Sequence, residues 1–270
     1  MNARKFLIAR ACWLLALVLV LGLGTEAQTP SNSKGEAEQA KQILQIPVGT
    51  ILPVRLNRGV SSKSAKPGQE ITGRIMQDVP LPAGGRIREG AKVLGKIVDA
   101  EPGSIHGGGR LTMRFDRIEV NRQESAIVAN LRALASTVEV QEAQVPDFSP
   151  GFGTPYNWVT TTQVGGDVVY GVGGPVTDTM SEHVGRAVNG GVLIQVRARA
   201  DSTCRGALNS EAPLQALWVF SSDACGVYGM EGTRIEKAGR TEPVGEIILV
   251  ATKGDVRLRM GSGMLLRIVR

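Results

Sequence analysis

The sequence predicts an all-β protein, in which a small β-barrel-like lobe is followed by a second β-rich lobe with one short helix. Three observations favour this class: 34 glycines, few aromatic residues, and many short Val/Ile/Leu-rich segments separated by turn residues. Such spacing is typical of β-sandwiches and small barrels. A porin-type barrel is not favoured, because its strands need sustained lipid-facing alternation between aromatic girdles.

The N-terminus, residues 1–27, is predicted to be a cleavable secretion signal. Arg4, Lys5 and Arg10 precede an apolar run from Ala11 to Leu23, and small and polar residues follow up to Ala27. This order is that of a signal peptide, and the run is shorter than the about 20 apolar residues of a membrane span. We therefore expect a mature chain without a transmembrane span, located in the periplasm or outer cell envelope or secreted.

The mature chain is predicted to contain four parts. A polar linker (residues 28–45) leads into the β-barrel-like lobe (46–137), a connector rich in glycine, proline and aromatic residues (138–177) follows, and a C-terminal β-rich lobe (178–270) ends the chain. Strands of the first lobe are expected at 51–56, 69–76, 92–100, 110–120 and 125–131.

The strand at 110–120 carries a change of phase. Leu111, Met113 and Phe115 alternate on one face, whereas Ile118 and Val120 continue the alternation in the opposite phase. One extra residue at Asp116–Arg117 would explain the change, and a β-bulge supplies such a residue. The pattern therefore predicts a bulge that bends this strand, as small barrels require.

The second lobe is predicted to begin with a helix at 179–189. Thr179 and Glu182 have the spacing of a capping box, and Val184, Ala187 and Val188 would share one helix face. Strands are then expected at 192–200, 214–220, 245–251, 255–260 and 264–269.

Two sets of residues are candidate contact surfaces. The connector gathers aromatic residues, which either form a flap packed over its own domain or contact a partner: Phe148, Phe152, Tyr156, Trp158 and Tyr170. The second set is arginines that either solubilise the surface or hold a polyanion: Arg197, Arg199, Arg257, Arg259 and Arg267. Specific nucleic-acid binding is not expected, because base-stacking aromatics are nearly absent from the C-terminal strands.

Catalytic chemistry finds little support in the residue patterns. The histidines are His106, in a glycine-rich turn, and His183, which leaves little scope for general base catalysis. No Gly-x-Ser-x-Gly pattern occurs, and Ser262 between two glycines is more simply a turn residue. Closely paired Cys or His ligands for zinc are also missing. We therefore predict a non-enzymatic protein without metal or cofactor.

Cys204 and Cys225 are the cysteines that remain once Cys12 leaves with the signal. Disulfides persist in exported proteins, and the chain between these two residues is long enough to double back. We expect a disulfide between them, either within one chain or between two chains.

Residues 46–120 contain a series of turn and strand motifs. These are Gly49-Thr50-Ile51-Leu52-Pro53-Val54, Ser61-Ser62, Pro67-Gly68, Asp78-Val79, Gly90-Ala91-Lys92-Val93-Leu94-Gly95, Gly109-Arg110-Leu111 and Phe115-Asp116-Arg117-Ile118. In this order they resemble the C-terminal β-barrel domain of the TrbI family, the channel-core subunits of conjugation and type IV secretion systems. The resemblance implies a barrel fold and, more distantly, a role in a secretion-type assembly. Family members usually keep an uncleaved membrane span and a proline-rich periplasmic arm, whereas this chain is expected to have a cleaved signal and only a short polar linker.

The sequence leaves three functions open. The leading one is a structural or protein-interaction role, with other envelope proteins or through self-association. The alternative is a binding module for an anionic envelope polymer, and a hydrolase with an unrecognised active site ranks last. High salt separates the first two, because it weakens electrostatic binding.

The export prediction can be tested directly. The mature protein recovered from the producing cells should begin at or near Gln28, because cleavage is expected after Ala27. N-terminal sequencing or intact mass measures this. A mature chain that still begins with Met1 contradicts export by a cleaved signal.

Overall fold

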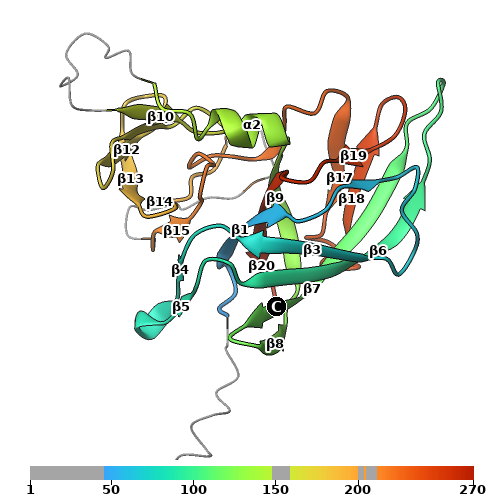
Figure 1. Ribbon diagram of the computed structural model, residues 1–270, viewed down its shortest axis with the longest axis horizontal. Helices are drawn as coiled ribbons and strands as arrows, with labels where there is room; N and C mark the ends of the chain where they lie inside the picture. The colour runs from blue at the N-terminus through green and yellow to red at the C-terminus, as the bar shows by residue number, and fades with distance from the viewer. Residues whose placement is uncertain (1–45, 148–158, 200–203, 205–211) are drawn as a thin grey trace, which may run out of the picture. The chain divides into compact units, whose positions relative to one another are not determined.

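The computed structural model describes residues 46–147, 159–199, 204 and 212–270 and confirms the all-β class (Figure 1). These residues form a ten-stranded sheet, a six-stranded sheet and two two-stranded ribbons, with one short α-helix among them. The predicted signal and polar linker lie outside the described residues.

The ten-stranded sheet brings together strands from both ends of the described chain. Its members are β1 (Ile51–Leu56), β3 (Glu70–Ile75), β6 (Lys92–Glu101), β7 (Arg110–Val120), β8 (Gln123–Ala126), β9 (Ala129–Ala135), β16 (Gly226–Tyr228), β17 (Thr233–Ala238), β18 (Ile247–Ala251) and β20 (Gly263–Ile268). Their order across the sheet is β16-β9-β20-β1-β3-β6-β7-β18-β17, and β8 pairs with β7.

The six-stranded sheet runs in chain order from β10 to β15. Its strands are β10 (Thr160–Thr162), β11 (Val168–Tyr170), β12 (Pro175–Thr177), β13 (His183–Val188), β14 (Gly191–Ile194) and β15 (Gln215–Ala216). The ribbons pair β2 (Val60–Ser61) with β19 (Arg257–Leu258) and β4 (Val79–Pro80) with β5 (Arg86–Ile87). The helix is α2 (Thr137–Glu142), and a 3-10 turn, η2 (Pro82–Gly84), separates β4 from β5.

The ten-stranded sheet is strongly curled. Its two edge strands, β16 and β17, are neighbours in the sequence and are joined by residues 229–232 alone. A linker of this length spans little more than about 17 Å when fully extended, so the two edges of the sheet must lie close together. Accordingly, β17 contacts both β16 and β9. No described residues of β17 pair with either strand, so the predicted barrel-like lobe is a curled sheet that does not close into a barrel.

The lobes predicted at 46–137 and 178–270 contribute to one sheet and one core. Strand β20 pairs with β1 and with β9, and β18 pairs with β7. Leu52, Phe115 and Leu134 share a buried cluster with Leu249 and Leu266. Strands from the two predicted lobes therefore pair with one another in the ten-stranded sheet, and the connector does not divide them into two separate sheets.

Three central strands are buried on both faces. Every residue of β9 is buried, and β1 and β20 each have a single residue that is not fully buried. Leu52 and Leu266 face the interior of the curl, whereas Ile51, Ala133 and Leu265 belong to a second core with the six-stranded sheet. Two-sided burial explains the nearly continuous apolar runs of these strands.

The predicted bulge in β7 is confirmed. Arg117 pairs with Leu94 and Phe115 pairs with Gly95, which leaves Asp116 as the extra residue. Leu111, Phe115 and Ile118 are all fully buried, because the bulge returns the later apolar residues to the inner face.

The predicted helix at 179–189 is wrong, since His183–Val188 forms β13 between β12 and β14. Asp178 organises the preceding turn, and its carboxylate accepts hydrogen bonds from the backbone N–H groups of Met180 and Glu182. The helix lies instead at Thr137–Glu142, where the Ser136 hydroxyl accepts from the N–H of Glu139. Long-range strand pairing overrides the local helical pattern.

The predicted connector has regular structure in its described residues. It contains most of α2, together with β10, β11 and β12. The strands predicted at 125–131 and 214–220 differ in extent: the first is divided between β8 and β9, and the second is reduced to Gln215–Ala216.

A glycine opposite the β7 bulge provides a test of this packing. A Cβ added at Gly95 would lie 2.2 Å from the Arg114 carbonyl oxygen. Gly95→Ala should therefore lower the free energy of unfolding by about 2 kcal/mol, as overpacking does. Gly107→Ala is the matched control, because its Cβ would meet only the Ser104 hydroxyl at 3.5 Å. Equal stability of the two variants in urea unfolding would contradict the close approach of β6 and β7.

Candidate functional site: a disulfide, an arginine cavity and an apolar groove

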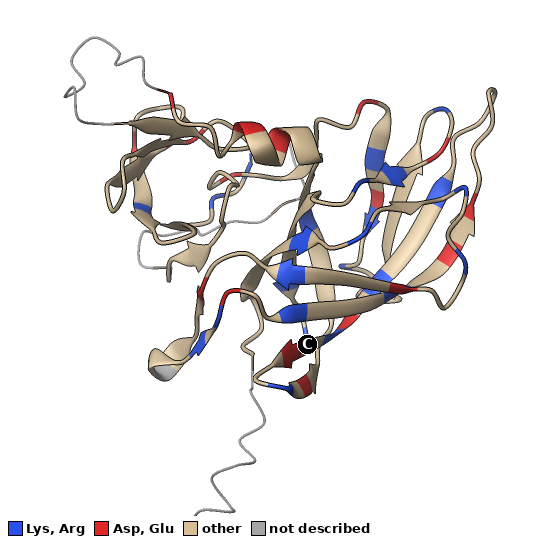
Figure 2. Ribbon diagram, in the orientation of Figure 1, with Lys and Arg blue, Asp and Glu red and all other residues tan. Residues whose placement is uncertain are grey.

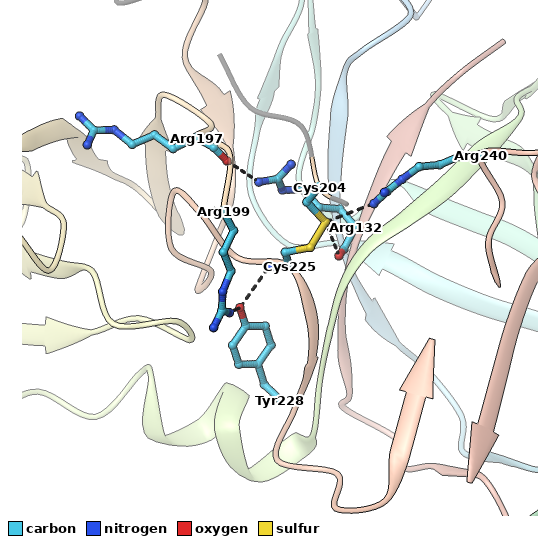
Figure 3. Close-up of a disulfide and its surroundings, with 7 residues drawn as sticks. All are labelled: Arg132, Arg197, Arg199, Cys204, Cys225, Tyr228 and Arg240. Atoms are coloured by element: carbon cyan, nitrogen blue, oxygen red, sulfur yellow. Dashed lines mark hydrogen bonds between the residues drawn. A yellow bond between two sulfur atoms is a disulfide. The ribbon is translucent and has the colours of Figure 1, made fainter. Parts of the chain in front are cut away.

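The expected disulfide between Cys204 and Cys225 is present and lies within one chain (Figure 3). It ties residue 204 to the residue immediately before β16. Two hydrogen bonds lead to this edge: the backbone N–H of Cys225 donates to the Tyr228 hydroxyl at 3.0 Å, and Arg199 Nη1 donates to the same hydroxyl at 3.2 Å. The disulfide therefore fixes the chain at an edge of the curled sheet.

The turn that leads to Cys225 is also fixed by hydrogen bonds. The Asp167 carboxylate is buried and accepts from the backbone N–H of Ser222 at 2.7 Å, and the Ser221 hydroxyl donates to Asp223 at 3.1 Å. Burial is the main cause that raises the pKa of Asp167, while the bond from Ser222 opposes the rise. We assign these groups a structural role in placing Cys225.

Arg132 lies beside the disulfide and was not among the candidates from the sequence. In the pairing of β9 with β20, Leu131 faces Leu266 and Ala133 faces Leu265, which leaves Arg132 as a bulged residue. A bulge redirects a side chain that would otherwise alternate with its neighbours. Its Nη2 donates to the carbonyl oxygen of Arg197 at 2.8 Å, and the residue is 3% exposed.

Arg132 keeps its positive charge at neutral pH. Desolvation is the main cause that lowers its pKa, to about 10, and the positive charges of Arg267 and Arg240 lower it further. Asp223 and Tyr228 act in the opposite direction. The electrostatic effect of Arg240 and Arg267 on Arg132 means that three guanidinium groups from different segments lie near one another.

These three arginines line one cavity of about 660 Å³, which we call the arginine cavity. The described residues around it are Val48, Asn130, Arg132, Arg240, Thr241, Arg267, Ile268 and Val269. Arg240 also places Nη2 3.1 Å from the Cys204 sulfur. The described lining contains three basic side chains, and two of them, Arg132 and Arg240, have further interactions within the chain.

A second cavity, of about 570 Å³, lies where the edges of the curled sheet approach one another. Arg132 and Arg240 line it together with residues of β16 and β17 and both cysteines of the disulfide. Arg234 and Glu236 also line it, so its charge is mixed. This cavity shares Arg132 and Arg240 with the arginine cavity, but its mixed lining is less selective for negative charge.

The other side of the arginine cavity adjoins an apolar groove of about 550 Å³. The residues around this groove are Pro47, Val48, Gly49, Thr50, Ile51, Pro80, Leu81, Pro82, Val196, Ala212, Pro213, Leu214, Gln215 and Arg267. Val48 and Arg267 line both sites. Val48 is 71% exposed and Leu214 is 37% exposed, so the groove presents apolar side chains to the surroundings.

The structure does not bring the five predicted arginines together on one face. Arg197 directs Nη1 to Asp178 and Glu182, at 2.6 and 2.7 Å, and away from the disulfide (Figure 3). Arg257 lies on β19 near Asp255, and Arg259 follows it on the same segment. Arg199 and Arg267 do lie at the cavities described above. A charged residue inside the apolar run of β9 was the signal that could have pointed to Arg132.

The curled sheet carries a different basic surface on its outer face. Arg55 on β1 pairs with Arg74 on β3, which pairs with Lys92 on β6, and Figure 2 shows basic residues on these neighbouring strands. The three side chains are exposed. Lys92 also contacts Glu119 at 2.9 Å. Like charges directly opposite each other repel, so this row attracts anions in solution.

The aromatic contact surface predicted in the connector falls largely outside the described residues. Phe148, Phe152, Tyr156 and Trp158 lie outside the described residues. Tyr170 is half-buried on β11, opposite Thr160.

Other chemical groups are dispersed. His106 and His183 are exposed, and the Ser262 predicted to occupy a turn is fully buried beside β20. In the part of the chain that the structure describes, no group of three or more His, Cys, Asp or Glu side chains is placed to hold a metal ion. Among the described residues, no helix has the length and apolar character needed to cross a bilayer.

A scan against protein-family models finds no family that matches this chain, and a search of curated proteins finds no match either. The similarity to the TrbI family therefore rests on the sequence motifs and stays a prediction.

The disulfide should make a large contribution to stability. Replacing both Cys204 and Cys225 with Ser should lower the free energy of unfolding by about 3 kcal/mol, because the bridge closes a loop of roughly 20 residues in the unfolded chain. Urea unfolding of the mature protein measures the difference. The double variant should not respond to a reducing agent, whereas the natural chain should lose a similar amount on reduction. A natural chain whose stability is unchanged by reduction contradicts this role.

Proposed function

We propose that this chain is an exported, non-enzymatic envelope protein that assembles with other envelope proteins. The observation that carries the proposal is the apolar groove, where exposed Val48 and Leu214 lie beside an edge of the six-stranded sheet. Exposed apolar surface that is organised into a groove is typical of contact sites. The predicted signal and the disulfide both agree with a place outside the cytoplasm.

The groove suits an extended segment of a partner protein. Strand β15 is the last strand of its sheet in the described residues, and its Gln215 lines the groove. An extended peptide can add to such an edge and place alternate side chains in apolar pockets. Pro47, Pro80 and Pro213 stiffen the walls, because proline fixes its own φ angle. A stiff groove loses little conformational entropy when it binds.

The similarity to the TrbI family supports the same role from the sequence. The family's members are subunits of a multiprotein channel, so a relative of their barrel domain would also work by contact with other chains. We propose a place in a secretion-type assembly on this ground. The curled ten-stranded sheet is compatible with the proposal.

Substitutions in the groove test the assembly role. Cross-linking in the producing cells, followed by sizing at low and high salt, should detect a complex that survives about 1 M salt, because apolar contacts are not screened as charges are. Val48→Asp and Leu214→Asp should each abolish it, since a buried unpaired charge is costly. Val172→Asp is the matched control, as Val172 is fully exposed and lies outside the groove.

Three outcomes count against assembly with other envelope proteins through the groove. The first is a strict monomer under both conditions. The second is a complex that dissolves in high salt and is weakened by Arg55→Gln or Arg74→Gln, which would favour an anionic envelope polymer on the basic row. The third is a complex that the purified mature chain forms alone, which would assign the groove to a second copy.

A further inference from the structure

The outer face of the curled sheet carries a basic row, which consists of Arg55, Arg74 and Lys92 on the neighbouring strands β1, β3 and β6 (Figure 2). We propose that this row binds an acidic polysaccharide, a linear polymer that carries a carboxylate on each sugar. The proposal goes beyond the assembly role, because it assigns a second ligand to a surface outside the apolar groove. It also places polyanion binding on residues other than the arginines that the sequence predicts for it.

The three basic side chains stand directly opposite one another. Arg55 pairs with Arg74, and Arg74 pairs with Lys92. The backbone N–H of Ile75 donates to the Ala91 carbonyl oxygen at 2.9 Å. Hydrogen-bonded and non-hydrogen-bonded pairs alternate along antiparallel strands, so Arg74 and Lys92 form a non-hydrogen-bonded pair, in which side chains lie closest. Like charges opposite each other destabilise a sheet, and an anion bound across the row removes this repulsion.

One of the three charges is neutralised within the part of the chain that the structure describes. Lys92 Nζ contacts Glu119 on β7 at 2.9 Å. The exposed side chains of Arg55 and Arg74, in contrast, form no ion pair or hydrogen bond with the described residues. On its other side Arg55 faces Gly263 of β20, which offers no side chain. Two guanidinium groups therefore present their donors to the solvent.

The surroundings of the basic row favour a narrow ligand over a broad anionic surface. Glu119 and Glu124 continue the row on β7 and β8 as paired acidic residues, so a flat bilayer of anionic lipid would also meet negative charge. The next row on the same face pairs Thr72 with Leu94, and Leu94 is 7% exposed. That row offers no exposed apolar side chain for insertion among lipids.

Arginine geometry and strand spacing favour carboxylates arranged along a chain. A guanidinium group binds a carboxylate through a pair of hydrogen bonds. Neighbouring strands lie about 4.8 Å apart, and a polymer with one carboxylate on each sugar repeats its charge at a step of the same order. The phosphates of polyphosphate are joined through single oxygen atoms and follow one another more closely. Nucleic acid would need base-stacking aromatic residues, which β1, β3 and β6 do not contain.

Binding of a labelled oligosaccharide tests the basic row. The probe is a fluorescein-labelled galacturonate hexamer, and its twin carries methyl esters in place of the free carboxylates. Fluorescence polarisation at low ionic strength with the disulfide-bonded mature protein should detect binding of the acidic probe and not of the twin, and added salt should weaken it by screening. Arg55→Gln and Arg74→Gln should each weaken binding about fivefold, the scale of one exposed charge pair.

Two further variants separate the basic row from general charge. Arg257→Gln removes the same charge from an exposed residue of β19 and should leave binding unchanged. Glu119→Gln should strengthen binding about twofold, because it removes an acidic neighbour and the partner of Lys92. A merely structural role of the basic residues would not produce such a gain. Circular dichroism and urea unfolding confirm that each variant is folded.

Four outcomes overturn the proposal. They are no binding of the hexamer at low ionic strength, equal losses in Arg257→Gln and Arg74→Gln, tighter binding of polyphosphate of equal charge, and co-sedimentation with phosphatidylglycerol vesicles without binding of the hexamer. The assembly role is tested separately, because Val48→Asp should abolish the salt-resistant complex and leave hexamer binding unchanged. A salt-sensitive polymer complex beside the salt-resistant protein complex supports both proposals.

Discussion

Burial of the central strands on both faces is the constraint on which the rest of the molecule depends. Strands β1, β9 and β20 separate the interior of the curled sheet from the core of the six-stranded sheet, so all of their residues except Arg55 and Arg267 face packed atoms. A polar side chain there needs a partner or a way out. The bulge at Arg132 gives the side chain a partner, because it redirects the guanidinium so that Nη2 donates to the carbonyl oxygen of Arg197. The arginine cavity thus follows from how the sheet is built.

The curl has a second consequence for the same site. Because residues 229–232 join the two edge strands, β16 and β17 are held near one another and near β9, although they stand at opposite ends of the pairing order. The disulfide fixes the chain at the β16 side, where Cys225 precedes the strand. Arg240 follows β17 and reaches the sulfur of Cys204. The second cavity, which lies between these two edges, is therefore lined by residues that the disulfide and the strand pairings hold in place.

The sequence predicted the local features of this arrangement better than its long-range ones. The phase change after Phe115 correctly indicated the bulge at Asp116, since alternation is a property of one strand. Cys204 and Cys225 could be paired because no other cysteine remains in the chain once the predicted signal is removed. The helix was misplaced because Thr179 and Glu182 have the same spacing as Ser136 and Glu139, and only the pairing of β13 with β12 and β14 decides between them. The cavity joins Arg132, Arg240 and Arg267 through strand pairings that no local pattern contains.

Arg132 carries an electrostatic cost in the folded chain. Desolvation and two neighbouring positive charges lower the pKa of Arg132 to about 10, which means that its charged form is less stable in the folded chain than in the unfolded one. At neutral pH this charge opposes folding, and the cost is relieved only as the pH rises above the folded-state pKa. Other interactions must offset it, among them the bond to Arg197 and the closure of the disulfide. Groups with strongly perturbed pKa values gather at functional sites more often than elsewhere.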